Sequence, residues 1–459
     1  MSIKRNLFGT DGVRGIANVE PVTAENALKL GRAAAHIFST GHGHPKNNSR
    51  RKIVIGKDTR LSGYMLESSI MAGVTSMGVD VILIGPLPTP GVAYITRSLR
   101  ADAGIVLTAS HNSYEDNGIK FFRWDGFKLD DAVESRLEHL VFSDEIESIR
   151  PTAHKIGKAY RVDDALGRYV EFAKRSFPRG LTLESLKIAV DCANGAGYKS
   201  TPSILRELGA ELIVRYNEPS GTNINDRCGS TYPEEAQRLV RETGADIGIT
   251  HDGDADRVLL IDEDAQIVDG DEIMTIAAID FLNRGELVKN TLVATVMSNY
   301  GLEEALEPHG GKVIRTAVGD RYVIEAMMRE GYNVGGEQSG HMIFTDYGTT
   351  GDGIVCALQV LRVMIESGKP LRELRKNLHK YPQVQRNLKV SDRPPIDSLD
   401  EVKKLIDAAE KELNGKGRVL LRYSGTEPKI RLLIEGRDEK VIKNQADKIT
   451  DALQKVIGI

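Results

Sequence analysis

The sequence predicts an α/β protein: three related α/β domains with mixed, mostly parallel sheets, followed by a C-terminal α+β domain. Short apolar runs rich in β-branched residues alternate with helical stretches, an order typical of parallel sheets with helices on both faces. This order begins afresh twice along the 459 residues and changes in character near the C-terminus. A chain of this length corresponds to about three to four domains of roughly 100–200 residues each.

The first block contains three expected strands and two expected helices in alternation. The strands cover 51–56, 79–85 and 103–109, and the helices cover 66–78 and 89–99. This alternation indicates βαβ units, in which each helix crosses the sheet between two parallel strands.

The second and third blocks repeat the pattern of the first without repeating its residues. The second block has expected strands at 187–191, 211–216 and 245–250, with helices near 201–209 and 233–243. The third block has expected strands at 257–262, 292–298, 312–316 and 332–336, with helices near 271–283, 300–308 and 319–330. The shared order of elements predicts domains of one kind.

The last part of the chain differs from the three blocks. It has expected strands at 384–390, 418–424 and 430–436, and expected helices near 399–413 and 439–456. Two of these strands are separated only by a short turn, which favours antiparallel pairing. We therefore expect domains at 1–158, 159–256, 257–376 and 377–459.

The charge balance argues against nucleic acid or membrane as the main partner. The chain has 61 lysine and arginine residues and 65 aspartate and glutamate residues, so its formal net charge is 61 − 65 = −4. This charge provides no global basic field. The content of 41% hydrophobic and 27% charged residues is ordinary for a globular protein and excludes collagen, a coiled coil and long disorder.

The cysteines and the hydropathy pattern indicate a cytoplasmic protein. Cys192, Cys228 and Cys356 are widely spaced, odd in number and never in a C-x-x-C pair, which disfavours a disulfide scaffold, a zinc site or thiol redox chemistry. The N-terminal stretch has no apolar run of the signal-peptide kind, and the sequence has no apolar run of about 18 residues. We therefore expect neither a secretory signal nor a membrane span.

The motif DGDADR is a candidate site for a hard divalent cation. Asp252, Asp254 and Asp256 alternate between two expected strands, so their carboxylates face one way and repel each other without a cation. Oxygen ligands suit Mg²⁺ or Ca²⁺. An EF-hand shares the D-x-D-x-D opening and finds Glu263 at its twelfth position, but it requires glycine where Arg257 stands and helices as flanks. A solvated acidic turn is the alternative.

The motif TASHNSYEDNGIKFF places a serine where α/β sheets bind ligands. Ser110 follows the expected strand at 103–109, and Lys120 comes ten residues later. A serine at a strand's carboxyl end can be a nucleophile. No G-x-S-x-G surrounds it, and the adjacent His111 would point away on an extended chain, so a Ser–His hydrolase is disfavoured. Taken alone, the motif also fits a polar turn.

Two further motifs could bind the polar groups of a ligand. In GGEQSGHM, Glu337, Ser339 and His341 alternate after an apolar run and suit hydroxyl groups; a half-buried turn histidine is the alternative. In RYSGTEPKIR, a turn between two strands combines arginine, hydroxyls and free backbone N–H groups into a cradle for an anion; a solvated hairpin is the alternative. The residues of this cradle are Arg422, Ser424, Gly425 and Thr426.

The four motifs together predict a class of substrate. A cation site, a serine, a hydroxyl-binding loop and an anion cradle would all serve an anionic, polyhydroxylated molecule. The residues therefore indicate metal-assisted phosphoryl chemistry on a sugar phosphate.

These motifs resemble, in order, those of the phosphohexomutase superfamily. FGTDGVRG at 8–15 is similar to its N-terminal arginine loop, TASHNSYEDNGIK to its phosphoserine loop, and DGDADR to its metal loop. GEQSGH is similar to its sugar-binding loop and RYSGTEP to its phosphate-binding loop. Stretches such as VMSNYGLEEAL, AVGDRYVIEAM and TTGDGIVCALQVL most resemble the branch that acts on glucosamine phosphate. One departure is Ser113, where the family usually has a proline that would stiffen the loop.

The resemblance implies a fold and a set of roles. The four domains would surround a deep central cleft, and Ser110 would carry a covalent phosphate. One Mg²⁺ would be held by Asp252, Asp254, Asp256 and a phosphate oxygen on Ser110. Protons would be moved by Lys120 and His341, charge would be clamped by Arg14 and Arg257, and the sugar would be held by Glu337, Ser339 and His341. The phosphate that is not reacting would be held by Arg422, Ser424, Gly425 and Thr426.

The implied activity is an isomerase that interconverts glucosamine 6-phosphate and glucosamine 1-phosphate through a 1,6-bisphosphate. Glucosamine or glucose 1,6-bisphosphate would prime the serine, the partner would be a small hexosamine phosphate, and a homodimer is compatible with the resemblance. Two alternatives stay open: a mutase for glucose or mannose phosphates, and a non-catalytic sugar-phosphate binder. The binder is disfavoured because Ser110 and all three aspartates are present.

Overall fold

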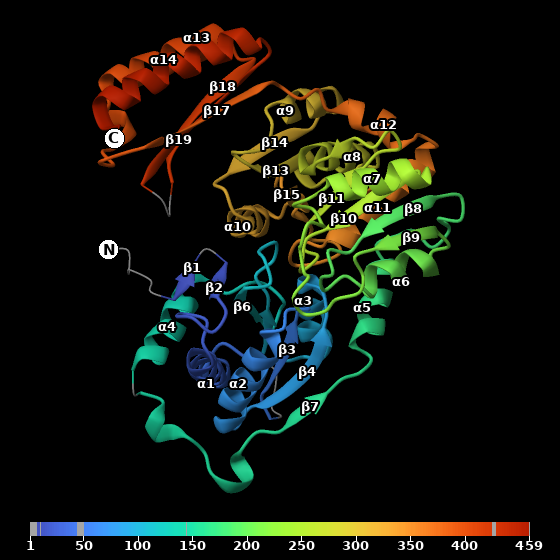
Figure 1. The fold of residues 1–459 in the computed structure, drawn as a ribbon, viewed down its shortest axis with the longest axis vertical. Helices are drawn as coiled ribbons and strands as arrows, with labels where there is room; N and C mark the ends of the chain where they lie inside the picture. Colours follow the sequence, from blue (N-terminus) through green and yellow to red (C-terminus); the bar gives the residue numbers. More distant parts are fainter. Residues whose placement is uncertain (1–6, 10, 44–49, 144, 425–427, 459) are drawn as a thin grey trace.

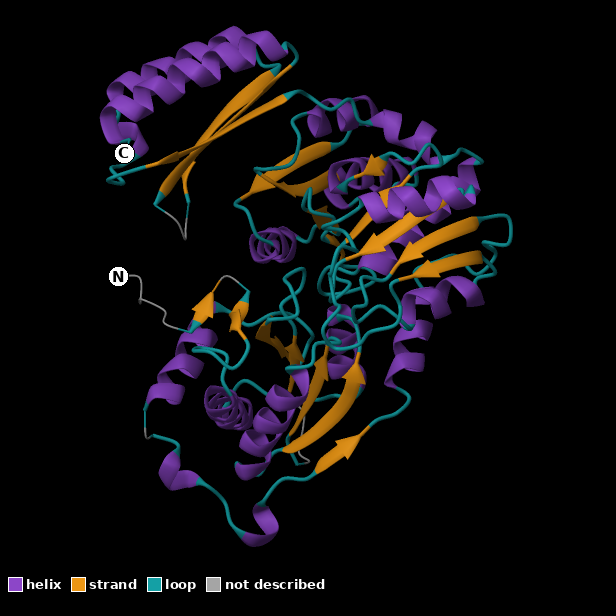
Figure 2. Cartoon of the chain, viewed as in Figure 1, coloured by secondary structure: helices purple, strands orange, loops and turns teal. Residues whose placement is uncertain are grey.

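The computed structural model describes residues 7–9, 11–43, 50–143, 145–424 and 428–458. Four units follow one another along an arc, with the first and fourth at its two ends (Figure 1). Three contain a sheet between helices, and the fourth has a small sheet with two helices on one face (Figure 2). This confirms the predicted fold class.

The first unit is built on a seven-stranded sheet in the order β1-β2-β6-β5-β3-β4-β7. Its strands are β1 (Phe8–Gly9), β2 (Gly12–Ile16), β3 (Lys52–Lys57), β4 (Asp80–Pro86), β5 (Ala103–Leu107), β6 (Asp116–Arg123) and β7 (Ala159–Arg161). Its helices are α1 (Ala24–Thr40), α2 (Gly63–Ser76), α3 (Thr89–Ser98) and α4 (Asp131–Phe142). The expected strands form its parallel part together with β7, and β1, β2 and β6 extend that part with antiparallel pairs. Because β7 pairs with β4, the first sheet continues to Arg161, and the expected boundary at residue 158 is wrong.

Alternation along the central strands explains why both faces of this sheet are covered. Ile53 and Ile55 of β3 pack into the apolar cluster that contains α1, α2 and α4, whereas Val54 packs on the opposite face with α3. Successive residues of a strand point to opposite faces, so a continuous apolar run predicts a strand buried on both. All five residues of β5 are buried, which places the end of β5, before Ser110, inside the molecule.

The second and third units have smaller mixed sheets. The second sheet has the order β12-β11-β10-β8-β9, from β8 (Lys187–Asp191), β9 (Glu211–Arg215), β10 (Ile247–His251), β11 (Val258–Ile261) and β12 (Ile267–Val268). The third has the order β14-β13-β15-β16, from β13 (Thr291–Thr295), β14 (Lys312–Thr316), β15 (Val334–Gly336) and β16 (Met342–Phe344). Their helices are α5 (Ala165–Lys174), α6 (Ser200–Glu207), α7 (Glu234–Thr243), α8 (Gly270–Asn283), α9 (Gly301–Leu306), α10 (Asp320–Glu330), α11 (Gly353–Ser367) and α12 (Leu371–Leu374).

One expectation about these sheets is wrong. The sequence predicts the strand at 257–262 as part of the third block, but β11 pairs antiparallel with β10 and belongs to the second sheet. The second sheet therefore continues to Val268, past the expected boundary at residue 256. The physical reason is that the six-residue loop 252–257 is too short for a crossover and returns the chain beside the strand it has just left.

The fourth unit is an antiparallel sheet covered by two amphipathic helices. Its strands are β17 (Gln383–Lys389), β18 (Gly417–Tyr423) and β19 (Lys429–Gly436), in the order β17-β19-β18. The helices α13 (Asp400–Leu413) and α14 (Glu439–Ile457) bury their apolar faces against it. The other face of the sheet turns toward the third unit (Figure 1). None of the helices in the described ranges combines the length and apolar character needed to cross a bilayer.

Two glycines allow α1 and α2 to pack closely. A Cβ added at Gly73 would lie 2.2 Å from the carbonyl oxygen of Leu28, and one added at Gly31 would lie 2.6 Å from that of Ile70.

We expect Gly73→Ala to destabilise the protein by about 1–3 kcal/mol, because the backbone oxygen cannot rotate away. Gly167→Ala on α5 is the control: nothing lies within 4 Å of its added Cβ, so higher helix propensity should stabilise by up to ~1 kcal/mol. Thermal unfolding of both variants checks this, and an unchanged melting temperature for Gly73→Ala would contradict it.

Candidate active site

Ser110 lies just after β5, where the first unit meets the second. Its side chain is buried, and its backbone has a left-handed φ of 52°, held in part by a hydrogen bond from its N–H to Oγ1 of Thr108 at 2.9 Å. Ser110 Oγ donates a hydrogen bond to Oδ2 of Asp252 at 2.6 Å. The serine therefore contacts the carboxylate loop of the second unit directly, although 142 residues separate the two in the chain.

The loop between β10 and β11 gathers three buried carboxylates. Asp252, Asp254 and Asp256 each offer an oxygen, and these oxygens all lie within 4.8 Å of one another. Burial and the charges of Asp254 and Asp256 raise the pKa of Asp252 well above its usual value. Asp254 Oδ1 is buried and accepts no hydrogen bond from any described residue. An all-oxygen set with an unused buried acceptor fits a hard cation such as Mg²⁺.

Lys120 supplies positive charge to this cluster from β6, the antiparallel neighbour of β5. Its Nζ lies 3.2 Å from Oδ2 of Asp254 and 2.8 Å from Oδ2 of Asp11. Burial lowers the pKa of Lys120, but the carboxylates of Asp11, Asp254 and Asp256 outweigh burial and raise that pKa above the ordinary lysine value. Lys120 is therefore held as an ammonium ion beside the carboxylates.

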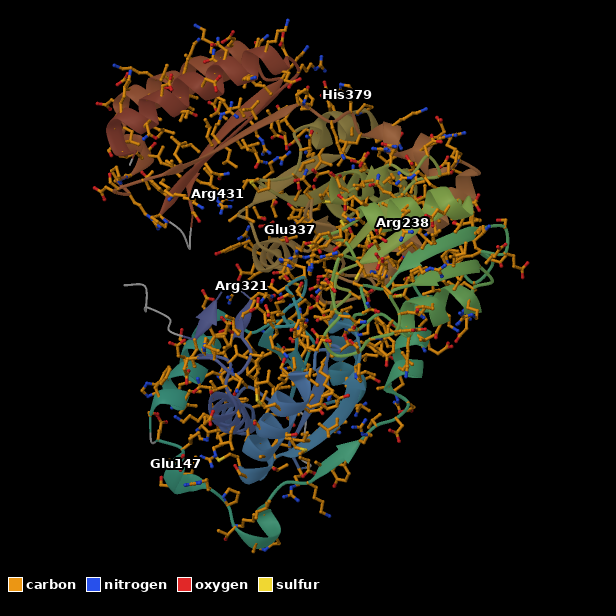
Figure 3. The ribbon with its side chains drawn as sticks, in the orientation of Figure 1. Glu147, Arg238, Arg321, Glu337, His379 and Arg431 are labelled. Carbon is orange, nitrogen blue, oxygen red and sulfur yellow. The ribbon has the colours of Figure 1, made fainter. Side chains whose placement is uncertain are left out.

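The turn between β15 and β16 brings the third unit to the same place. The buried His341 has Nδ1 3.5 Å from Oδ1 of Asp256 and Nε2 3.4 Å from Oδ2 of Asp320. Burial lowers the pKa of His341, but these two carboxylates raise it above its usual value. Glu337 lies near the centre of the molecule (Figure 3), where its Oε1 accepts a hydrogen bond from the N–H of Gly319 at 3.0 Å, and Ser339 is exposed on the turn.

Two arginines and a histidine surround the serine and the carboxylates. The N–H of Arg257 donates to Oδ1 of Asp252 at 3.2 Å, its Nη1 lies 3.4 Å from Nδ1 of His111, and Arg14 pairs with Asp11 at 3.3 Å. Burial, Arg257 and Arg14 lower the pKa of His111 to about 4, so this ring is neutral at pH 7. The hydroxyl of Ser110 lies 3.4 Å from Nδ1 of His111, but it donates its hydrogen bond to Asp252 at 2.6 Å. This geometry disfavours a catalytic Ser–His pair, in agreement with the expectation from the sequence.

The fourth predicted motif contacts the third unit instead of the serine. Gly425 and Thr426 lie outside the described residues. Arg422, near the end of β18, has Nη2 4.0 Å from Sδ of Met297, and it lines a cavity of about 230 Å³ together with Lys429 and Arg431. Burial and the nearby Arg431 lower the pKa of Arg422. Figure 3 shows Arg431 on the side of this unit that faces the third, so the cavity presents cationic side chains between the two units.

Sequence reasoning missed three charged residues that connect this site to the third unit. Lys128 Nζ bonds to Oδ1 of Asp11 at 2.6 Å and also to Oδ2 of Asp320, which in turn faces His341. Asp11 and Asp320 lie within motifs that the sequence analysis quoted, FGTDGVRG and AVGDRYVIEAM. An aspartate in each motif was the available signal, but nothing local shows that both pair with one lysine.

Comparison with known proteins agrees with this arrangement. The four domains described for phosphoglucomutase/phosphomannomutase match the chain in order: α/β/α domain I at residues 5–147, domain II at 168–266, domain III at 269–381 and the C-terminal domain at 386–452. The phosphoglucosamine mutase of Syntrophotalea carbinolica is 56% identical over 457 residues, which cover 100% of this chain and 99% of that protein. That of Geobacter sp. strain M21 is 57% identical over 454 residues, or 99% of each.

The chain belongs to the phosphoglucosamine mutase family. It is accordingly an isomerase of the phosphohexomutase superfamily, and the resemblance predicted from its motifs is confirmed.

Solved structures of phosphohexomutases share the fold at lower identity. A phosphoglucomutase/phosphomannomutase family protein from Burkholderia thailandensis has a TM-score of 0.79 at 24% identity and covers 98% of both chains. The N-acetylphosphoglucosamine mutase of Aspergillus fumigatus, solved with GlcNAc-6P and magnesium, has a TM-score of 0.62 at 21% identity over 80% of this chain and 93% of that one. The arrangement of four units is thus that of the superfamily.

The carboxylate cluster is expected to bind Mg²⁺. Asp254→Asn removes one of three negative charges, so we expect the affinity for Mg²⁺ to fall by at least about tenfold without unfolding the protein. Excess EDTA should abolish activity and Mg²⁺ should restore it. The affinity for Mg²⁺ is measured by calorimetry and by activity as a function of Mg²⁺ concentration. Asp264→Asn is the matched control, because Asp264 is an exposed aspartate in the next turn. Full turnover in EDTA would contradict the assignment.

Proposed function

We propose that this chain interconverts glucosamine 6-phosphate and glucosamine 1-phosphate, with Ser110 as the phosphoryl carrier. One observation supports this most: the serine hydroxyl bonds to Asp252 inside the buried carboxylate cluster. The near relatives over the full chain are phosphoglucosamine mutases. The proposal includes a small hexosamine phosphate as partner, a 1,6-bisphosphate of glucosamine or glucose as primer, and a cytoplasmic location.

In the first half-reaction, phosphorylated Ser110 donates its phosphoryl group to the 1-hydroxyl of glucosamine 6-phosphate. The Oγ–phosphorus bond breaks while a bond forms between phosphorus and O1. The hydroxyl proton leaves O1, and Oγ takes up a proton, so the step is balanced. The product is glucosamine 1,6-bisphosphate.

In the second half-reaction, the bisphosphate presents its 6-phosphate to Ser110. The bond between phosphorus and O6 breaks, the bond between phosphorus and Oγ forms, and the serine proton is passed on to O6. Glucosamine 1-phosphate leaves, and the phosphoserine is restored.

The side chains around Ser110 suit these steps. Lys120, held as an ammonium ion beside Asp254, is a candidate proton donor, and His341 is the second candidate proton mover. Arg257 and Arg14 would stabilise phosphate charge, while Glu337 and Ser339 would bind sugar hydroxyls.

Asp252, Asp254 and Asp256 would hold Mg²⁺, which neutralises charge that develops on a transferring phosphoryl group. Arg422, which lines the cationic cavity, would hold the distal phosphate together with Ser424, Gly425 and Thr426 of the same motif.

A direct test of the carrier is Ser110→Ala. The variant lacks the phosphoryl acceptor, so turnover should fall by far more than tenfold while glucosamine phosphate still binds. Mass spectrometry of the intact wild-type protein should find one phosphate on Ser110, and none on the variant. Activity of Ser110→Ala within about tenfold of wild type, a barrier change of only ~1.4 kcal/mol, would show that another residue carries the phosphoryl group.

A second test concerns the sugar. All superfamily members bind a ring and two phosphates, so specificity must come from groups near C2, where glucosamine has its nitrogen. Glu337 would favour an ammonium group, and Gln338 would shape the loop. We expect kcat/KM for glucosamine phosphate to exceed that for glucose and mannose phosphates by about tenfold or more. Side-by-side kinetics with the primed enzyme measures this. Equal efficiency on all three would leave the mutase chemistry standing and reject the glucosamine preference.

A further inference from the structure

The backbone around Ser110 is held by two buried side chains that the proposed chemistry does not use. Arg60 lies in the first unit, between β3 and α2, and Asn225 lies in the second unit, between β9 and α7. Both donate hydrogen bonds to carbonyl oxygens of the serine loop. They approach it from different units of the fold.

Arg60 is the largest fully buried side chain of the described chain, with 1% of its surface exposed. Its Nη2 donates to the carbonyl oxygens of Ser110 at 3.2 Å and Asn112 at 2.6 Å, and its Nε donates to that of Ser113 at 3.4 Å. The opposite edge of the guanidinium pairs with Asp58. Because one planar guanidinium group donates to three carbonyl oxygens, the peptide groups of the loop have little freedom to rotate.

Asn225 binds two of the same carbonyl oxygens from the second unit. Its Nδ2 donates to the carbonyl oxygen of Ser110 at 2.9 Å and to that of Asn112 at 2.8 Å. The carbonyls of Ser110 and Asn112 therefore each accept hydrogen bonds from both units. The same contacts bridge the first unit to the second next to the bond between Ser110 and Asp252.

The same contacts restrain the loop at Ser113. Serine restricts its own backbone less than a proline would, and the Ser113 carbonyl accepts a hydrogen bond from Arg60. Ser110 itself has a left-handed φ, a conformation that non-glycine residues adopt only when the surroundings impose it. Phosphoryl transfer depends on the angle and distance of attack, so an error of about 1 Å in the position of Oγ can cost ~100-fold in rate.

We propose that Arg60 and Asn225 are positioning residues that fix the backbone of Ser110 for phosphoryl transfer. They act through the serine and touch no reacting atom. This inference rests on the proposed function of Ser110 as carrier. The clamp keeps Oγ at one place over the carboxylate cluster in both half-reactions, with and without its phosphoryl group.

The first experiment compares Asn225→Ala with Asn223→Ala. Asn223 lies in the same loop but donates to the carbonyl of Glu218, so its variant makes the same chemical change away from the serine. For Asn225→Ala we expect the single-turnover rate of transfer from phosphorylated enzyme to glucosamine 6-phosphate to fall by about 10–100-fold. KM and the melting temperature should stay close to wild type. Asn223→Ala should transfer at the wild-type rate.

The second experiment addresses Arg60, whose loss alone would leave Asp58 buried without its partner. Arg60→Lys keeps the positive charge but loses the planar guanidinium group, and the double variant Asp58→Asn/Arg60→Gln removes both charges together. We expect both to lower the transfer rate per phosphorylated molecule. Rates are counted per phosphoserine, measured by mass spectrometry, so a smaller folded fraction does not mimic a positioning defect.

The outcomes separate the inference from the function on which it rests. A lower transfer rate with unchanged KM in the Asn225 and Arg60 variants supports positioning. Lower melting temperatures with a wild-type rate per phosphoserine would overturn it and leave only a structural role. A wild-type enzyme that turns over without phosphate on Ser110 would reject the proposed function itself.

Discussion

Three buried carboxylates in one short loop constrain the rest of the molecule. The oxygens of Asp252, Asp254 and Asp256 lie within 4.8 Å of one another in a place that water barely reaches. Buried ionised groups are costly unless opposite charges and hydrogen bonds surround them. Lys120 from the first unit and His341 from the third supply those partners, as does a cation if it binds. The point where the three α/β units meet is therefore also the point where the chemistry is proposed.

The same need for charge pairing connects the first and third units. Asp11 lies between Lys120 and Lys128, and Lys128 reaches Asp320, which faces His341. Charges alternate from Lys120 through Asp11 and Lys128 to Asp320 along this partly buried row, so each of these four has a partner of opposite sign. Lys120 and Asp254 are nearly fully buried, and removal of one partner of such a pair costs about 3–5 kcal/mol, because the other is left without compensation. The arrangement of the units and the charge state of the site are thus stabilised by one set of contacts.

The fourth unit stands apart from the carboxylates and carries positive charge. It is attached to the third unit through polar contacts, in which Glu435 accepts from the N–H of Tyr300 at 3.2 Å and Arg418 donates to the carbonyl of Ser298 at 2.7 Å. Arg422, Lys429 and Arg431 line the cavity between these units. A substrate with a phosphate at each end needs two regions of this kind, one where phosphate reacts and one where it is held.

Most of the strands and helices, and the loops that contain Ser110, Asp252 and His341, could be predicted from the sequence, because apolar periodicity and turn residues act over a few neighbouring positions. The strands β1, β2, β6, β7, β12 and β16 were not expected. The strands β8 and β14 have the predicted bounds, and local motifs in the sequence are enough to mark Ser110, Asp252 and His341 as candidate site residues. The tertiary structure alone decided the rest. Hydrogen bonding placed β11 in the second sheet, and long-range packing brought Asp320 to Lys128 and Asn225 to Ser110, across 192 and 115 residues. Such pairs leave no local pattern, because what selects them is the free energy of burying charge and backbone carbonyls far from water.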